Sequence, residues 1–390
     1  MGAPSRIAFV CPRWPGEGAV GGAETLLKAL ARRAAAGGAE VTFLTTCAAS
    51  HHTWENARPA GDAELEGLHV KFFPVSPRDA GRFAALNGRI GRGGRLSPDE
   101  EKAWWANGVR SDELVEHLKQ ADYDRVVTGP YLLSLTRDAV FAAGRDRIRM
   151  VPCLHDEPFA RLAGVAEMFR ACGKCLFNAE GERQLAQRLF GADGARGDVV
   201  GMGMDDFACD AAGFRARHGI DAPFLLYCGR REPLKGTPLI CDYLAAFRSR
   251  TGRDLRMVFT GTGEIECPAK IRPFVTDLGF VDEKEKHDAM AASLAFFHPS
   301  RLESFGIVLF ESWLAGRPCL VRDQSPVLKA QCRASNGGLW FRHYADFEEE
   351  VLLLLDKPDV ADALGAAGRT FVLREYAWEA IDRKFRAAML

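Results

Sequence analysis

Short apolar runs alternate with segments whose apolar residues recur at helical spacing along the whole chain. In the first half, apolar runs predict strands at residues 6–10, 40–46, 68–73, 124–128, 149–153 and 175–178. Leu26, Leu27 and Leu30 recur at helical spacing and predict a helix over residues 23–36, which Gly37 ends. A regular succession of strands and helices predicts a parallel α/β sheet.

The same pattern starts again after a helix at 181–190 and the glycine-rich residues 191–194. The second half predicts strands at 224–228, 256–260, 295–298 and 319–321, and helices at 238–250 and 307–315. We therefore expect a hinge near residues 194–200 and two Rossmann-like domains, at 1–197 and 198–375. The last segment, 378–389, carries one apolar stripe and by itself would pack on the second domain.

Composition narrows the classes of function. The chain has 390 residues and a net charge of −1, so electrostatic attraction to nucleic acid is not expected. No run of eighteen apolar residues predicts a membrane-spanning helix, and residues 6–10 resemble a strand more than a secretory leader. A cytoplasmic location is the default expectation.

One segment departs from the alternating pattern because it is rich in arginine. Arg78, Arg82, Arg89, Arg92 and Arg95 occur with a single acid, Asp79, and with several glycines. We expect a loop here. It is either solvated or a surface for an anionic acceptor or lipid head group, which would give peripheral contact with the inner membrane surface.

Gly16 to Gly21 match the dinucleotide pattern G-x-G-x-x-G by letters, but the context argues against it. A true fingerprint follows the first strand directly, whereas residues 11–15 intervene here, and the second strand ends in threonines instead of an acid. We reject NAD binding. Gly21 and Gly22 still precede a helix, where small residues let an anion or sugar approach backbone N–H groups; a plain flexible loop is the alternative.

A loop in the second half carries two cations. Residues 229–236 read Gly-Arg-Arg-Glu-Pro-Leu-Lys-Gly and lie between a predicted strand and a helix. Arg230 and Lys235 therefore belong at the edge where open α/β sheets bind ligands, and such cations suit a diphosphate. Solvated charges on a surface loop are the alternative.

Two glutamates, Glu303 and Glu311, stand eight residues apart around the start of a helix. Ser304 and Gly306 lie between them, where backbone N–H groups favour negative charge. Carboxylates pair well with vicinal sugar hydroxyls, while helix capping and solvation are the alternative use.

Among the histidines, His155 follows an apolar strand and precedes Asp156, which favours a cleft over a satisfied position in the core. We treat His51, His52 and His298 as structural.

Taken together, these motifs resemble those of retaining GT-4 glycosyltransferases with the GT-B fold. The resemblance rests on Gly21-Gly22-Ala23-Glu24, on the G-R-x-x-x-x-K-G loop and on the E-x7-E element. Leu278-Gly279-Phe280-Val281 matches the segment that borders the base, whereas residues 200–205 lack the usual proline and asparagine of the hinge. The resemblance implies two domains that face each other across a cleft, and a final helix, residues 376–390, that crosses back to the first domain.

The resemblance also implies a role for each matching position. Arg230, Lys235, Glu303 and His155 would be catalytic; Gly21, Gly22, Gly229, Phe280, Ser304, Phe305, Gly306, Ile307 and Glu311 would bind the donor; Asp156 and Arg13 would lie on the acceptor side. Arg230 and Lys235 would neutralise the diphosphate, Glu303 would hold the sugar and Glu311 the ribose.

We therefore expect a hexosyltransferase that uses a UDP- or GDP-sugar and a glycan, lipid-linked or small-molecule acceptor, in the synthesis of cell-surface polysaccharide or glycoconjugate. We expect no resident cofactor, no metal and no nucleic acid partner. Two alternatives remain: a nucleotide-sugar epimerase of the same fold, which needs no acceptor, and a nucleotide-sugar-binding protein without turnover.

Overall fold

The structure, a computed structural model, describes residues 4–16 and 21–390. The chain divides into two units, Met1–Met202 with Asp382–Leu390, and Gly203–Ile381. The division falls a few residues beyond the expected position at 197. Most of the rejected glycine pattern, residues 17–20, lies outside the described residues.

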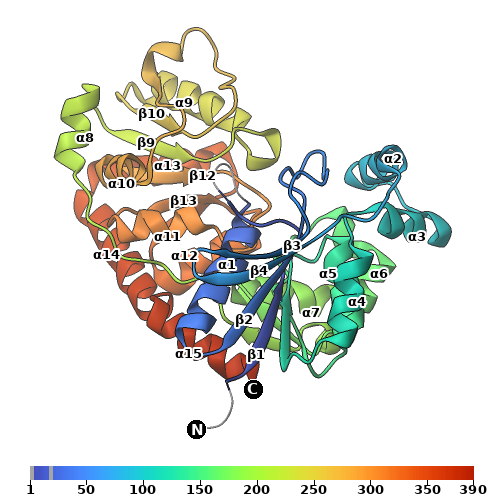
Figure 1. The fold of residues 1–390 in the computed structure, drawn as a ribbon. Coiled ribbons are helices and arrows are strands. Elements are labelled where there is room, and N and C mark those ends of the chain that lie inside the picture. The colour runs from blue at the N-terminus through green and yellow to red at the C-terminus, as the bar shows by residue number, and fades with distance from the viewer. Residues whose placement is uncertain (1–3, 17–20) are drawn as a thin grey trace. The chain divides into compact units, whose positions relative to one another are not determined.

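The described part of the first unit contains one sheet of eight strands, in the order β3-β4-β2-β1-β5-β6-β7-β8 (Figure 1). The strands are β1 (Arg6–Val10), β2 (Glu40–Thr46), β3 (Gly61–Leu65), β4 (Leu68–Phe73), β5 (Arg125–Thr128), β6 (Ile148–Met150), β7 (Lys174–Phe177) and β8 (Gly197–Val199). Neighbours pair in parallel except β3 with β4. Strand β3 is absent from the sequence prediction because its residues are largely exposed and form no apolar run.

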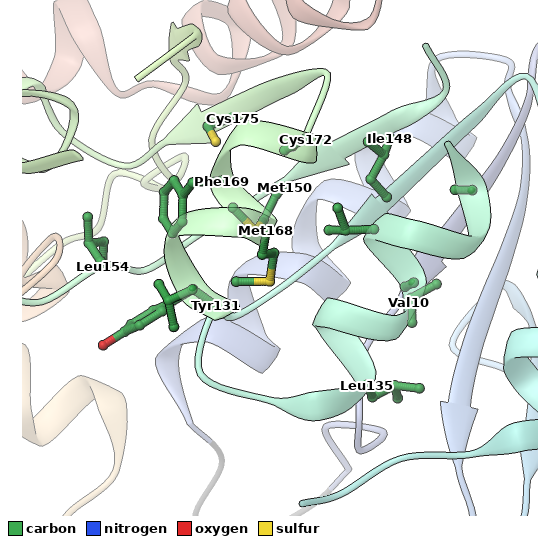
Figure 2. Close-up of a cluster of buried hydrophobic side chains, with 14 of the residues drawn as sticks. Val10, Tyr131, Leu135, Ile148, Met150, Leu154, Met168, Phe169, Cys172 and Cys175 are labelled. Atoms are coloured by element: carbon green, nitrogen blue, oxygen red, sulfur yellow. The ribbon is translucent and has the colours of Figure 1, made fainter. Parts of the chain in front are cut away.

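Helices cover both faces of this sheet. They are α1 (Gly22–Ala36), α2 (Ala80–Gly91), α3 (Pro98–Asn107), α4 (Asp112–Gln120), α5 (Ser134–Ala143), η1 (Pro158–Arg161), α6 (Ala163–Ala171) and α7 (Glu180–Gly194). Because side chains alternate along a strand, Ala8 and Val10 of β1 join one apolar cluster while Phe9 faces the opposite way. Figure 2 shows that cluster, in which Met168 and Phe169 of α6 lie beside Tyr131.

The expectation of a loop at residues 78–95 is wrong, because most of this segment is helix α2. Asp79 caps the helix by accepting a hydrogen bond from the backbone N–H of Arg82 at 2.8 Å. Phe83, Leu86 and Ile90 recur at helical spacing and pack against the core of the first unit. Their burial outweighs the weak helix propensity of the glycines, on which the prediction of a loop depended.

Two of the arginines in this segment already have protein partners. Arg78 donates to the carbonyl oxygen of Asn107 at 3.2 Å, and Arg89 pairs with Glu100 at 2.5 Å. Arg82, Arg92 and Arg95 are exposed. Contact with an anionic acceptor or a membrane through this segment stays a prediction.

The second unit is a doubly wound parallel sheet with the strand order β11-β10-β9-β12-β13-β14. Its strands are β9 (Phe224–Cys228), β10 (Arg256–Thr260), β11 (Val275–Asp277), β12 (Ala295–His298), β13 (Cys319–Arg322) and β14 (Gly338–Phe341). Its helices are α8 (Ala211–His218), η2 (Pro233–Lys235), α9 (Pro238–Thr251), η3 (Arg272–Phe274), α10 (Glu283–Ala292), α11 (Ile307–Leu314), α12 (Pro326–Ser335), α13 (Tyr344–Asp356) and α14 (Pro358–Glu375). The strand order reverses between β9 and β12, which is where such sheets bind ligands.

Helix α15 (Trp378–Met389) passes from the second unit into the first. Phe385 stacks on Phe9 of β1 with ring centroids 6.2 Å apart. The end of the helix is held by arginines: Arg125 donates to Met389 O at 2.6 Å and Arg149 to Ala388 O at 3.0 Å. The expected return of the last helix to the first domain is thus confirmed.

Among the described residues, no helix is both long enough and apolar enough to span a membrane.

Candidate active site in the second unit

The loops that follow β9 and β12 leave the same edge of the sheet. Both strands are parallel and adjacent, so their carboxyl ends lie side by side. The loop after β9 carries Arg230 and Lys235, and the loop after β12 carries Glu303. The strand order thus brings together two motifs that are almost seventy residues apart in the chain.

Gly236 lets these two loops approach closely. It adopts a left-handed conformation with φ 75° and ends the short helix η2. A Cβ atom on Gly236 would lie 2.5 Å from the carbonyl oxygen of Pro299, which follows β12. Only glycine fits this position, because any side chain would meet that oxygen and would also disfavour the backbone conformation. The contact sets Lys235 beside the second loop.

Lys235 and Glu303 form an ion pair at the junction of the two loops. Lys235 Nζ donates to Glu303 Oε1 at 2.6 Å, and His298 Nε2 lies 3.2 Å from the same oxygen. The Glu303 side chain is only 13% exposed and that of Lys235 is 30% exposed. The glutamate is thus a nearly buried acceptor beside a cation that solvent can reach.

The electrostatics keep Glu303 ionised. Burial by itself raises the pKa of Glu303, but hydrogen bonding from His298 and the charges of His298 and Lys235 outweigh burial. The pKa is therefore held well below its ordinary value of 4.5. An ionised carboxylate only accepts hydrogen bonds, which suits it to hydroxyl groups of a ligand.

The start of α11 offers backbone donors at the same edge. Gly306, with φ 85°, is the N-cap residue and supplies no side-chain cap to the described helix, so the first N–H groups are left for another acceptor. Ser304 and Ile307 are partly exposed on either side. The ring of Phe305 is buried and stacks on Phe310 at 4.3 Å, which leaves the backbone of Phe305 as the part that a ligand can contact.

Glu311 lies one turn into α11 and pairs with Lys286 of α10 at 2.9 Å. Its other oxygen, Oε2, is buried and has no hydrogen-bond partner among the described residues. Burial raises the pKa of Glu311, and the Lys286 ammonium opposes that rise. A buried carboxylate oxygen without a partner is costly unless a ligand donates to it.

Glu283, His287 and Glu311 come close enough to hold a metal ion, with donor atoms within 4.8 Å of one another. However, Lys286 Nζ binds Glu283 Oε2 at 2.8 Å as well as Glu311. An ammonium group therefore already supplies the positive charge that a metal would bring, so we assign no metal site to this cluster.

Arg230 and Arg231, neighbours in the loop after β9, differ in exposure and in their partners. The Arg230 side chain is 63% exposed and touches Glu232 at 3.0 Å. In contrast, Arg231 is 3% exposed and forms a bidentate pair with Asp277, at 2.5 and 3.1 Å. Arg230 is therefore the one free to reach a ligand, whereas Arg231 fixes the loop.

Asp277 also shapes the segment expected to border a base. It accepts a hydrogen bond from the backbone N–H of Gly279 at 2.9 Å, and Gly279 in turn accepts one from Gly261 at 2.7 Å. The next residue, Phe280, is 81% exposed. An aromatic ring that contributes so little to the core is a candidate surface for stacking. The neighbouring loop, which follows β9, begins at Gly229 with φ 138°.

In the first unit, the side chain of Arg13 forms a salt bridge with Glu24. Arg13 Nε and Nη2 donate to the two carboxylate oxygens at 2.9 and 2.7 Å, and the pair is nearly buried. Glu24 also accepts from the backbone N–H of Gly21 at 2.9 Å, so the pair fixes the entry to α1, which begins at Gly22. Arg13 therefore stabilises the loop before α1 indirectly, through its salt bridge with Glu24.

His155 and Asp156 lie in the loop after β6. His155 Nδ1 is 3.6 Å from Glu157 Oε1, and Asp156 pairs with Arg161 at 2.6 Å. Buried Glu182 holds this loop by accepting the backbone N–H of Leu154 at 2.6 Å. Burial raises the pKa of Glu182 to about 8, although hydrogen bonds from backbone N–H groups oppose this rise.

Five residues to which the sequence assigns no role in the site support those that it does single out: Lys286, Asp277, Glu182, Glu24 and His298. Of these, Glu24 enters only as part of a motif, and His298 is expected to be structural. A role of His298 in the site could have been found, because it ends an apolar strand at the same sheet edge as Lys235. The others reveal themselves only through tertiary contacts.

The geometry defines a site for an anion and for hydroxyl groups at the switch point of a doubly wound sheet, which is the usual place for a nucleotide. Comparison with known proteins agrees. Residues 212–371 match the family described as Glycosyl transferases group 1.

Relatives and solved structures extend the likeness over the whole chain. D-inositol 3-phosphate glycosyltransferase 1 of Catenulispora acidiphila is 28% identical over 98% of this chain and 94% of its own. The sucrose-phosphate synthase structure from Thermosynechococcus elongatus has a TM-score of 0.68 at 16% identity, over 98% of both chains. Anabaena Alr3699/HepE in complex with UDP-glucose has a TM-score of 0.66 at 17% identity, over 98% of both. The likeness to the solved structures shows that the chain has the GT-B fold, and the matched segment and the relatives support a glycosyltransferase of the GT4 type.

Proposed function

We propose that the protein moves a hexose from a UDP- or GDP-linked donor to a hydroxyl group of a glycan, lipid-linked or small-molecule acceptor, with retention of configuration and without a metal. The observation that carries this proposal is the contact between Lys235 Nζ and Glu303 Oε1, because it joins a cation and a hydroxyl acceptor at the switch point. The proposed setting is the synthesis of cell-surface polysaccharide or glycoconjugate in the cytoplasm.

In the proposed reaction, negative charge builds up on the β-phosphate oxygen as the glycosidic bond breaks. Lys235, exposed Arg230 and the uncapped start of α11 would stabilise that charge, and one such donor is worth ~2.7–4 kcal/mol. The departing phosphate oxygen would take the proton of the acceptor hydroxyl on the same face of the sugar. Glu303 would accept hydroxyls of the donor sugar, and Oε2 of Glu311 would accept those of the ribose.

The comparisons suggest the first substrates to test. UDP-glucose is named with the Anabaena structure, and D-inositol 3-phosphate is in the names of the relatives. We include both in a panel of UDP- and GDP-sugars and of acceptors.

The experiment combines a thermal-shift screen of the donor panel with turnover of the donor that binds. We expect Lys235→Ala and Glu303→Ala to lose most activity, while Lys119→Ala, which removes an exposed lysine of α4, keeps it. The anomeric configuration of the product, read by NMR, tests retention. Near-full activity of both site variants would refute the assignment, and conversion of the donor to an epimeric sugar without any acceptor would indicate an epimerase.

A further inference from the structure

His298 contacts the key glutamate of the site from inside the fold. It is the last residue of β12 and is 5% exposed. Its Nε2 lies 3.2 Å from Glu303 Oε1, the oxygen that also accepts from Lys235 at 2.6 Å. The two oxygens of Glu303 are therefore used unequally: the protein engages Oε1 twice, whereas Oε2 accepts no hydrogen bond from the described residues.

The two partners of Oε1 differ in how firmly they are held. Lys235 has a long flexible side chain that is 30% exposed, so a bound diphosphate can draw its ammonium away from Glu303. His298 has a short planar side chain that is 6% exposed and stacked on Phe296 with ring centroids 5.3 Å apart. The imidazole can hold the carboxylate in place whichever way Lys235 turns.

The other ring nitrogen of His298 supports a role in the site. Nδ1 is buried and has no hydrogen-bond partner among the described residues. A histidine retained only for packing would be costly there, because its unsatisfied nitrogen gains nothing over an apolar side chain of similar size. What the ring does gain is the contact of Nε2 with Glu303.

We infer that His298 is a positioning residue that fixes the Glu303 carboxylate through Oε1 and so leaves Oε2 to accept hydroxyls of the donor sugar. The inference rests on the proposed function. Recognition of the sugar then depends on His298, whereas recognition of the diphosphate depends on Lys235 and Arg230.

The test compares the inhibition constant of the nucleoside diphosphate with kcat/KM of the preferred nucleotide sugar. We expect His298→Leu to lower kcat/KM at least tenfold and to change the inhibition constant by less than twofold. His298→Gln should restore most of kcat/KM, because its amide nitrogen reaches the place of Nε2, whereas the shorter His298→Asn should not. The glutamine and asparagine variants decide the matter even if the leucine variant does not fold.

His218 provides a matched control in the same unit. Its Nε2 lies 2.6 Å from Glu285 Oε1, away from the two loops of the site, so His218→Leu also removes a histidine from a glutamate. This variant should leave both constants unchanged. The inference is overturned if His298→Leu keeps kcat/KM, if it weakens diphosphate and donor equally, or if His298→Asn is rescued as well as His298→Gln. If the wild-type protein binds no nucleoside diphosphate at all, the proposed function itself fails.

Discussion

The ion pair between Lys235 and Glu303 makes a quantitative prediction. At 2.6 Å and an effective dielectric constant of ~20, the attraction of the two charges is about 6 kcal/mol. Desolvation of the nearly buried carboxylate offsets much of it, and Lys235 is 30% exposed, so we expect a net coupling of ~1–3 kcal/mol. Lys235→Met should leave Glu303 with His298 as its remaining partner and should therefore destabilise the fold more than Glu303→Gln does.

The assay is a double-mutant cycle on both stability and turnover. Urea unfolding of the wild type, Lys235→Met, Glu303→Gln and the double variant gives the coupling energy. Release of nucleoside diphosphate gives kcat, which should fall ~10²–10³-fold in Lys235→Met because one donor to the leaving group is lost. The double variant should lose less than the product of the two single losses, since the residues act as a unit. Additive free energies of unfolding together with near-normal turnover of Lys235→Met would refute the reasoning.

Three further predictions concern neighbouring positions. Gly236→Ala should destabilise the protein by at least ~1 kcal/mol more than Gly252→Ala in urea unfolding, because both glycines have positive φ but only Gly236 would meet a carbonyl oxygen; equal losses would contradict this. Phe280→Ala should leave the free energy of unfolding within ~0.5 kcal/mol of the wild type, since the ring is 81% exposed, and should weaken nucleotide affinity in calorimetry; unchanged affinity would exclude stacking. Lys286→Met should move the acid limb of the pH–activity profile to higher pH. The reason is that burial already raises the pKa of Glu311, and the variant removes the ammonium group that opposes this rise. An unmoved limb would show that Glu311 does not titrate in the reaction.

The sequence predicted several of the buried, mainly apolar strands and missed others, such as β14. Strands β9, β10 and β12 have the predicted bounds, because buried parallel strands are continuous apolar runs between glycines and polar residues. It failed at β3, which is exposed, and at α2, where three core contacts outweigh several glycines. Local propensity is a weak guide wherever a few tertiary contacts decide the conformation.

The candidate site shows the same limit. The resemblance implied that Lys235 and Glu303 act on the same donor, and the structure brings them together because their motifs follow adjacent strands. It could not show that Arg13 is committed to Glu24, because such pairing depends on how a loop returns to a helix. Nor could it separate Arg230 from Arg231, whose exposure differs greatly although they are neighbours in the chain.

We propose that a nucleoside diphosphate binds against the two loops at the β9–β12 switch point. Hydrogen–deuterium exchange with saturating UDP or GDP reports on this binding mode. We expect slower exchange in peptides covering residues 229–237 and 299–307, and loss of that protection in Lys235→Met. Protection confined to other peptides, or none in these two while the nucleotide is bound, would contradict it.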